Sequence, residues 1–247
     1  MNHTIRELME RKSVRVFADR EITREQRKQI LLAATAAPTA GNQQMYTIID
    51  VQDPEIKEQL ADLCDHQPFI AKAKLVLVFL ADYRKWFDAF AAAGASPRQP
   101  EEGDLLLAVS DACIAAQNAV TAAWSMGIGS CYIGDVMEQC ESMRKLLALP
   151  PYTFPAAMLV FGYPTQQQMD RKKPERCALS DIVCIDNYHS KTGDELKNMF
   201  AHRTGNSSYE TYMQAFCDRK YNSDFSKEMS RSVREYLKEW KAAERES

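Results

Sequence analysis

The stretch LLLAVSDACIAAQNAVTAAWSMG, residues 105–127, is the longest apolar segment of the chain, and the rest of the fold has to be arranged around it. Its small and apolar residues recur almost all round a helix, interrupted by Ser110, Asp111, Gln117 and Asn118. A helix that is apolar on most faces belongs in a core or at a subunit interface. The four polar residues argue against a membrane span. We therefore predict a long helix over about residues 104–126 that lies either in the core or at a subunit interface.

Three shorter apolar runs, rich in branched residues, predict central strands: MYTIIDV (45–51), KLVLVFLA (74–81) and PAAMLVFGY (155–163). For the glycine-containing segment GIGSCYIGDV (127–136), the sequence leaves open whether it forms a fourth strand. Residues 23–36 begin with the capping box Thr23 and Gln26 and predict a helix. Further helices are expected over 54–64, behind the cap Asp53, and over 137–147. Polar, basic TQQQMDRKKPERC (165–177) predicts a loop, and short helical patterns follow near 194–200 and 226–244.

Composition describes an ordinary globular protein of 247 residues, with 45% hydrophobic and 26% charged residues and a formal net charge of −3. This balance gives no reason to expect nucleic acid as a partner. The N-terminus lacks the apolar core of a secretory signal, so a cytoplasmic location and no membrane association are expected. Seven cysteines without a CxxC and four scattered histidines disfavour disulfides and a metal site. Most of the thiols are expected to be small core residues.

Familiar enzyme motifs are missing from the sequence. No GxGxxG follows a predicted strand, and there is no P-loop and no GxSxG. Neither a Ser/His/Asp set nor a carboxylate pair stands out, so no catalytic acid or base is assigned.

Two basic clusters are candidates for binding a phosphate. Residues 11–15 contain Arg11, Lys12, Ser13 and Arg15 at the end of the first predicted helix. This cluster is either a solvated helix end that complements the helix dipole or a cradle in which guanidinium and hydroxyl groups grip phosphate. The second cluster, residues 171–173, follows a predicted buried strand.

The amide-rich stretch APTAGNQQMY, residues 37–46, is a third candidate element. It is either a turn built by Pro, Gly and Asn or a wall that recognises the polar edges of a planar heterocycle. A phosphate cradle and a heterocycle wall together would fit a nucleotide-like cofactor.

RKSVRVF, APTAGNQQMYTII, CYIGDV and GYP…RKKP, in this order, resemble the flavin-dependent nitroreductase superfamily. The segment DNYHSKTGDEL…FAHRTGNSS is similar to its oxygen-insensitive NADPH nitroreductase and NADPH-flavin oxidoreductase branch. The resemblance runs from Ile5 to about Leu237. It implies an α+β fold with a mixed sheet flanked by helices, in a domain-extended homodimer. It also implies FMN at the dimer interface, with residues 1–185 as the FMN-binding core and 186–247 as an extension wrapping the core or the partner subunit.

The same resemblance implies roles for particular residues. Ser13 and Arg15 would face the phosphate, Thr39 and Gln67 would contact the flavin, and residues 132–135 would run along its ring. Asn42 would shape the acceptor pocket, and Arg203 would meet the extra phosphate of NADPH. The cofactor-binding residues so implied are Arg11, Lys12, Ser13, Val14, Arg15, Thr39, Gln67, Tyr132, Ile133, Gly134, Asp135, Arg171, Lys172 and Lys173.

The sequence departs from that family at several of these positions. Lys12 replaces a more usual arginine, Asp135 replaces a common glycine, and a second arginine for the NADPH phosphate is missing from TGNSSYE. The expected activity is ping-pong hydride transfer from NADPH or NADH through FMN to a small-molecule acceptor, such as a nitroaromatic, a quinone or a flavin. The alternatives are a flavin reductase that supplies reduced FMN, a flavin-binding redox sensor, and an anion-binding scaffold without flavin.

Overall fold

A computed structural model describes residues 1–240 of the chain. It divides into two compact units, one formed by Met1–Arg171 with the C-terminal segment from Glu228, and one formed by Lys172–Lys227. The predicted division into 1–185 and 186–247 stays a prediction, and the last seven residues of that extension lie outside the described part.

The first unit is built on a four-stranded sheet in the order β1-β2-β4-β3. The strands are β1 (Tyr46–Val51), β2 (Leu75–Asp82), β3 (Gly129–Ile133) and β4 (Thr153–Gly162). The three predicted strands are confirmed, and the segment left open, residues 127–136, contains the fourth strand. Every neighbouring pair is antiparallel, so the expected mixed sheet is wrong. The connections from β1 to β2 and from β3 to β4 join neighbouring antiparallel strands, whereas the connection from β2 leads to β3 on the far side of β4. Among the described residues, parallel pairing is limited to the single bridge between Ser13 and Ser130.

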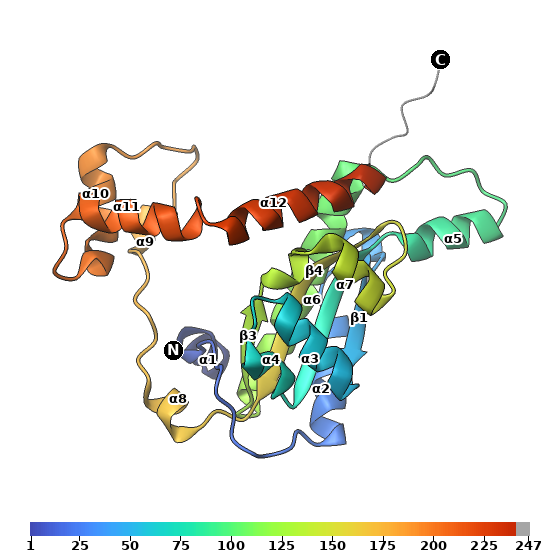
Figure 1. The fold of residues 1–247 in the computed structure, drawn as a ribbon, viewed down its shortest axis with the longest axis horizontal. Coiled ribbons are helices and arrows are strands. Elements are labelled where there is room, and N and C mark those ends of the chain that lie inside the picture. The colour runs from blue at the N-terminus through green and yellow to red at the C-terminus, as the bar shows by residue number, and fades with distance from the viewer. Residues whose placement is uncertain (241–247) are drawn as a thin grey trace. The chain divides into compact units, whose positions relative to one another are not determined.

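The sheet buries both faces, and β2 shows this most clearly. Leu75, Leu77 and Phe79 belong to one hydrophobic cluster, whereas the alternate residues of the strand belong to the other. This is the period of two that a strand imposes on its side chains. Helices α2 (Arg24–Thr35) and α6 (Glu102–Ser125) cover the first face, and α3 (Pro54–Leu63), α4 (Pro68–Ala71) and α7 (Cys140–Leu147) cover the second (Figure 1).

Helix α6 is the predicted long apolar helix, and the structure confirms it. By length and composition it is apolar enough to cross a membrane. However, Ala112, Ala115, Ala116 and Ala119 are fully buried against the sheet and α2. The small residues allow this close approach, so α6 is a core helix of the first unit.

Local capping signals define several of the shorter elements. Thr23 and Gln26 form the predicted capping box of α2, and the Asp53 side chain accepts from Glu55 N at 2.8 Å at the start of α3. A short helix, α8 (Gln166–Asp170), lies inside the predicted loop of residues 165–177. The remaining elements of this unit are α1 (His3–Glu10), η1 (Ala40–Asn42), α5 (Arg84–Ala92) and η2 (Asp135–Met137).

The second unit contains α9 (Leu179–Ile182), α10 (Gly193–Thr204) and α11 (Tyr209–Lys220). The helix predicted near 194–200 is part of α10. The one predicted over 226–244 corresponds to α12 (Asp224–Leu237) and η3 (Lys238–Trp240), with 241–244 outside the described residues. From Glu228 onward this segment belongs to the first unit, where Tyr236 and Trp240 are fully buried.

The cysteines differ from the prediction. All seven are free, but only Cys64, Cys131 and Cys140 are buried, whereas three are exposed and Cys177 is intermediate. The expectation that most thiols are core residues is therefore wrong. One of the exposed thiols, that of Cys113, lies on α6, whose first half also exposes large apolar side chains.

Candidate functional site

Residues 13–17 run along the edge strand β3 and then past the end of β4. Ser13 forms a bridge with Ser130, Val14 N donates to Ser130 O at 3.0 Å, and Phe17 forms a bridge with Pro164. Two glycines permit this approach. A Cβ at Gly129 would lie 2.5 Å from Val14 Cγ2, and one at Gly162 would lie 2.6 Å from the Phe17 ring. The absence of these two side chains places residues 11–15 at the end of the sheet.

The first basic cluster meets Arg171 of the second cluster there, although some 160 residues separate the two segments in sequence. The Lys12 ammonium donates to the carbonyl oxygens of Met169 and Arg171, and Arg171 Nη2 donates to Ser13 O at 3.2 Å. Arg15 N donates to the buried Gln168 side chain at 3.3 Å. The ammonium group of Lys12 therefore holds residues 11–15 against residues 169–171.

Arg11, Ser13, Arg15 and Arg171 form what we call the cradle. None of its three arginines forms an ion pair with a carboxylate anywhere in residues 1–240. The Cys131 thiol lies beside the cradle, where burial raises its pKa and the nearby Arg15, Ser13 and Arg11 oppose that shift. Guanidinium groups without a protein counter-ion, next to a serine hydroxyl, suit a phosphate or a similar anion.

A second part of the predicted site lies at the other end of β3. Gln67 Nε2 donates to Asp135 Oδ2 at 2.8 Å, so the structure brings together two residues that are far apart in sequence. Ile133 and Val14 are buried in the core, which leaves them only backbone atoms for a ligand. Tyr132 is 37% exposed, and its hydroxyl donates to Gln117 on α6 at 3.4 Å. Burial raises the pKa of Tyr132 to about 12.

The amide-rich loop is held by a buried carboxylate on α6. Asp111, 3% exposed, accepts from the Thr39 hydroxyl, from Ala40 N at 3.0 Å and from Met45 N at 3.2 Å. The Thr39 oxygen in turn accepts from Gln44 N at 2.8 Å. Thr39 thus has a structural role in this loop, while the Asn42 side chain is exposed at a positive φ of 55°.

Within one chain this loop does not reach the cradle. The strand pairing places both segments along the sheet. Ser13 pairs with Ser130, Ser130 pairs with Phe161, and Phe161 pairs with Leu75 at the start of β2. The amide-rich loop instead enters β1 opposite Ala81, near the other end of β2. Six residue steps of about 3.3 Å separate these levels, or about 20 Å along the sheet. Thr39 and Asn42 therefore lie at the opposite end of the sheet from the cradle of their own chain.

Three predicted residues belong to the second unit: Lys172, Lys173 and Arg203. Arg203 lies on α10, with its guanidinium 5.7 Å from the centre of the Phe200 ring and its Nε 3.3 Å from His202 Nε2. The roles of these residues toward a cofactor or substrate stay predictions.

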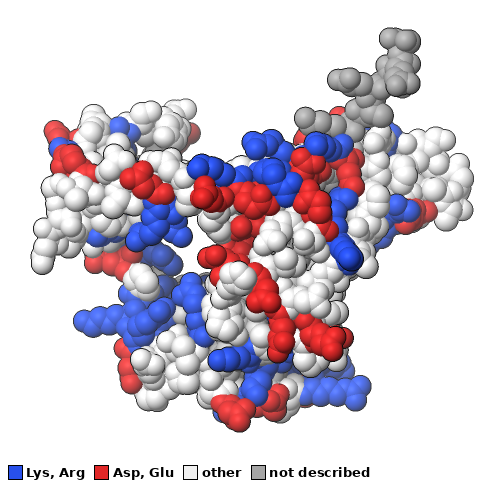
Figure 2. Space-filling model, in the orientation of Figure 1, with Lys and Arg blue, Asp and Glu red and all other residues white. Residues whose placement is uncertain are grey.

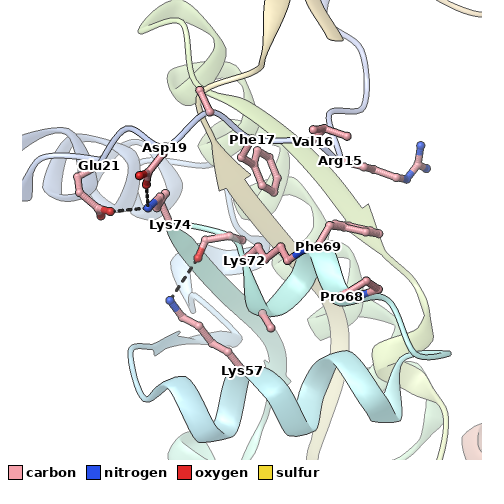
Figure 3. Close-up of a pocket in the computed structure, with 13 residues that line it drawn as sticks. Arg15, Val16, Phe17, Asp19, Glu21, Lys57, Pro68, Phe69, Lys72 and Lys74 are labelled. Atoms are coloured by element: carbon pink, nitrogen blue, oxygen red, sulfur yellow. Dashed lines mark hydrogen bonds and ion pairs between the residues drawn. The ribbon is translucent and has the colours of Figure 1, made fainter. Parts of the chain in front are cut away.

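A cavity of about 980 Å³ adjoins the cradle through Arg15 and adjoins Gln67 through Pro68 and Phe69 (Figure 3). Lys74, on its wall, is paired with Asp19 at 2.9 Å and with Glu21 at 2.6 Å. Of the predicted cofactor residues, only Arg15 lines this cavity. Basic and acidic side chains are interspersed over the drawn face of the first unit (Figure 2).

Sequence reasoning missed Asp111 and Gln168 as parts of the site. A charged residue in an apolar helix was the available signal for Asp111, because such a residue needs partners when it is buried. Nothing in the local sequence distinguishes Gln168 from its two glutamine neighbours.

An antiparallel sheet between helical layers defines the class: an α+β protein, with a cluster of arginines that have no carboxylate partner among residues 1–240 at one end of its sheet. The nitroreductase family model matches residues 8–163. The FMN reductase (NADPH) of Bacillus subtilis is 30% identical over 246 residues, covering 92% of this chain and 98% of that protein. B. megaterium NfrA2 has a structure with a TM-score of 0.85 at 27% identity, covering 97% of this chain and 98% of that one. The Vibrio harveyi NADPH:FMN oxidoreductase complexed with NAD+ has a TM-score of 0.77 at 27% identity, covering 99% and 100%.

The chain belongs to the nitroreductase family and is an oxidoreductase of that family. The resemblance predicted from the sequence motifs is thereby confirmed.

Proposed function

We propose that this protein binds FMN and acts as an NAD(P)H-dependent FMN reductase or nitroreductase. The observation that carries the proposal is the cradle, in which Arg11, Arg15 and Arg171 lack carboxylate partners among residues 1–240. Its donors fit the FMN phosphate, which carries a charge of about −1.5 to −2 at neutral pH. The names of the relatives, FMN reductase (NADPH) and NADPH:FMN oxidoreductase, support the same assignment.

When bound, FMN supplies the hydride chemistry, and the protein supplies binding, orientation and charge. The cradle would hold the phosphate, and Lys12 would keep the 11–15 segment against residues 169–171. Gln67 and the Tyr132–Asp135 loop would hold the ring. A small-molecule acceptor, a nitroaromatic, a quinone or a second flavin, would take the electrons after NADPH or NADH has left.

Arg15→Ala is expected to weaken FMN binding by about 10- to 100-fold, the loss expected for a charged hydrogen bond. Flavin fluorescence titration of the apoprotein measures this. Arg24→Ala, at an exposed arginine on α2, is the matched control and should bind FMN as the parent protein does. A colourless protein that gains no visible absorption with added FMN would contradict the proposal. Sustained NADPH oxidation with an acceptor would separate an enzyme from a redox sensor.

We also propose that the working form is a homodimer. The Thr39 and Asn42 loop lies at the far end of the sheet from the cradle of its own chain, so a second copy would have to supply it. Helix α6 exposes large apolar side chains that such a copy would cover: Leu106 is 67% exposed, Leu107 is 52% exposed and Ile114 is 41% exposed. Exposed apolar patches of this kind mark interaction surfaces.

The double substitution Leu106→Glu and Leu107→Glu is expected to give a monomer and to weaken FMN binding by about tenfold or more, because each site would lose its second wall. Sedimentation velocity and fluorescence titration report the two effects. Leu32→Glu, at a leucine that is 57% exposed on α2, is the control and should stay dimeric. A parent protein that sediments as a monomer while binding FMN tightly would refute the shared site.

A further inference from the structure

The side-chain amide of Gln67 is held in one orientation. Its Nε2 donates to Cys64 O and to Asp135 Oδ2, both at 2.8 Å. A carbonyl oxygen and a carboxylate oxygen are acceptors, so the two amide hydrogens are both used. The carbonyl oxygen Oε1 is therefore the end of Gln67 that remains for a ligand.

The loop that carries Asp135 is joined to the loop that carries Gln67 by a second bond. Gln139 Nε2 donates to Leu63 O at 3.0 Å. Both loops contain non-glycine residues at positive φ, with values of 59° at Asp65, 50° at His66 and 48° at Gln139. Such conformations persist only where the surroundings hold them. The position of residues 134–139 thus depends on the bonds at Asp135 and Gln139.

Glu138 lies in the same turn as Asp135 and is only 6% exposed. Its Oε1 atom has no hydrogen-bond partner in residues 1–240. Burial raises the pKa of Glu138 to about 7, with further contributions from the charges of Asp135, Asp65 and Glu228 and from a hydrogen bond with Asp135. Burial also raises the pKa of the nearby Cys64 thiol, which stays neutral.

The guanidinium group of Arg231, which contacts this region, is already paired with other carboxylates. Arg231 pairs with Glu228 at 2.8 Å and with Glu141 at 2.8 Å. Glu228 also accepts from Gln139 N at 3.2 Å. A charged Glu138 would therefore face Asp135, Asp65 and Glu228 without a cation of its own. Like charges at such a buried site disfavour ionisation.

We propose that Glu138 keeps its proton and donates it to Asp135, and that this carboxyl pair is a positioning device for Gln67 and the Tyr132–Asp135 loop. The inference rests on the proposed function, because the group positioned is the flavin ring. With the proton in place, Asp135 stays fixed as the acceptor of Gln67, and Gln67 Oε1 faces the ligand. Loss of the proton sets two carboxylates against each other and loosens the loop.

The test is flavin affinity as a function of pH. Riboflavin is the first probe because it lacks the phosphate, which itself titrates near pH 6, and FMN is the second. Between about pH 5.5 and about pH 8.5, the affinity of the parent protein for riboflavin should fall roughly three- to tenfold. Glu138→Gln should keep the tight value throughout. Glu141→Gln, at the exposed partner of Arg231, is the matched control and should follow the parent.

A parent protein whose riboflavin affinity does not change with pH would overturn the proposal, and so would a Glu138→Gln protein with the parent's slope. Asp135→Asn provides a second variant if Glu138→Gln does not fold, and its midpoint should move to lower pH because Glu138 then faces one carboxylate fewer. Absence of flavin binding at every pH would instead refute the proposed function.

Thermal unfolding of the apoprotein provides a readout that needs no flavin. The folded protein binds the Glu138 proton up to about pH 7, whereas an unperturbed glutamate releases it near 4.5. The contribution to stability is therefore greatest below pH 4.5 and is lost as pH rises toward 7. The difference in Tm between the parent and Glu138→Gln should change between about pH 4.5 and about pH 7. A constant difference would count against the proposed Glu138–Asp135 carboxyl pair.

Discussion

Replacement of Asp111 by leucine is expected to lower the free energy of unfolding by about 3 to 5 kcal/mol. The carboxylate is the shared acceptor for the Thr39 hydroxyl, Ala40 N and Met45 N at the entrance to β1. Leucine fills a similar volume but leaves these donors buried and unpaired. Each unpaired donor costs about 1–3 kcal/mol. Urea unfolding followed by circular dichroism measures the loss.

Ser110→Ala is the matched control on the same helix. Ser110 is exposed, and its hydroxyl donates to Leu106 O at 2.9 Å within the helix. Its removal should change stability by no more than about 0.5 kcal/mol. If Asp111→Leu were as stable as the parent, the buried carboxylate would not be the support of the amide-rich loop.

Gly129→Ala is expected to destabilise the protein by about 1–3 kcal/mol and to weaken FMN binding by about tenfold or more. The new Cβ would lie 2.5 Å from Val14 Cγ2 and 2.8 Å from Val14 Cβ, so the segment must move away from β3. That movement breaks the bond from Val14 N to Ser130 O and displaces Ser13 and Arg15 in the cradle. Urea unfolding and fluorescence titration measure the two effects.

Gly103→Ala is the control, because a Cβ there meets nothing within 4 Å. In the first turn of α6 it should leave FMN binding unchanged and stabilise the helix by up to about 1 kcal/mol. Adding Val14→Ala to Gly129→Ala should restore part of the affinity, since it removes the Cγ2 contact but leaves the contact with Cβ. Unchanged FMN affinity in Gly129→Ala alone would show that the cradle does not depend on this approach.

Much of the secondary structure could be predicted because its causes are local. The capping box of Thr23 and Gln26, the branched run of β2 and the small apolar residues of α6 each act within a few residues. The mixed sheet that the family resemblance implied was wrong for these four strands, and the sequence did not give their directions, because pairing depends on how distant segments return to the sheet. No prediction was made for α5, where Tyr83 supplies no side-chain cap.

The sequence by itself determined the family, the basic clusters and the long apolar helix, because residue type and order carry these directly. Tertiary structure alone decided how they combine. It joined Lys12 to residues 169 and 171, gave Asp111 the donors of the Thr39 loop, and placed that loop about 20 Å along the sheet from the cradle. It also buried Glu138 beside Asp135. Burial and hydrogen bonding between distant residues depend on packing, which local sequence patterns do not specify.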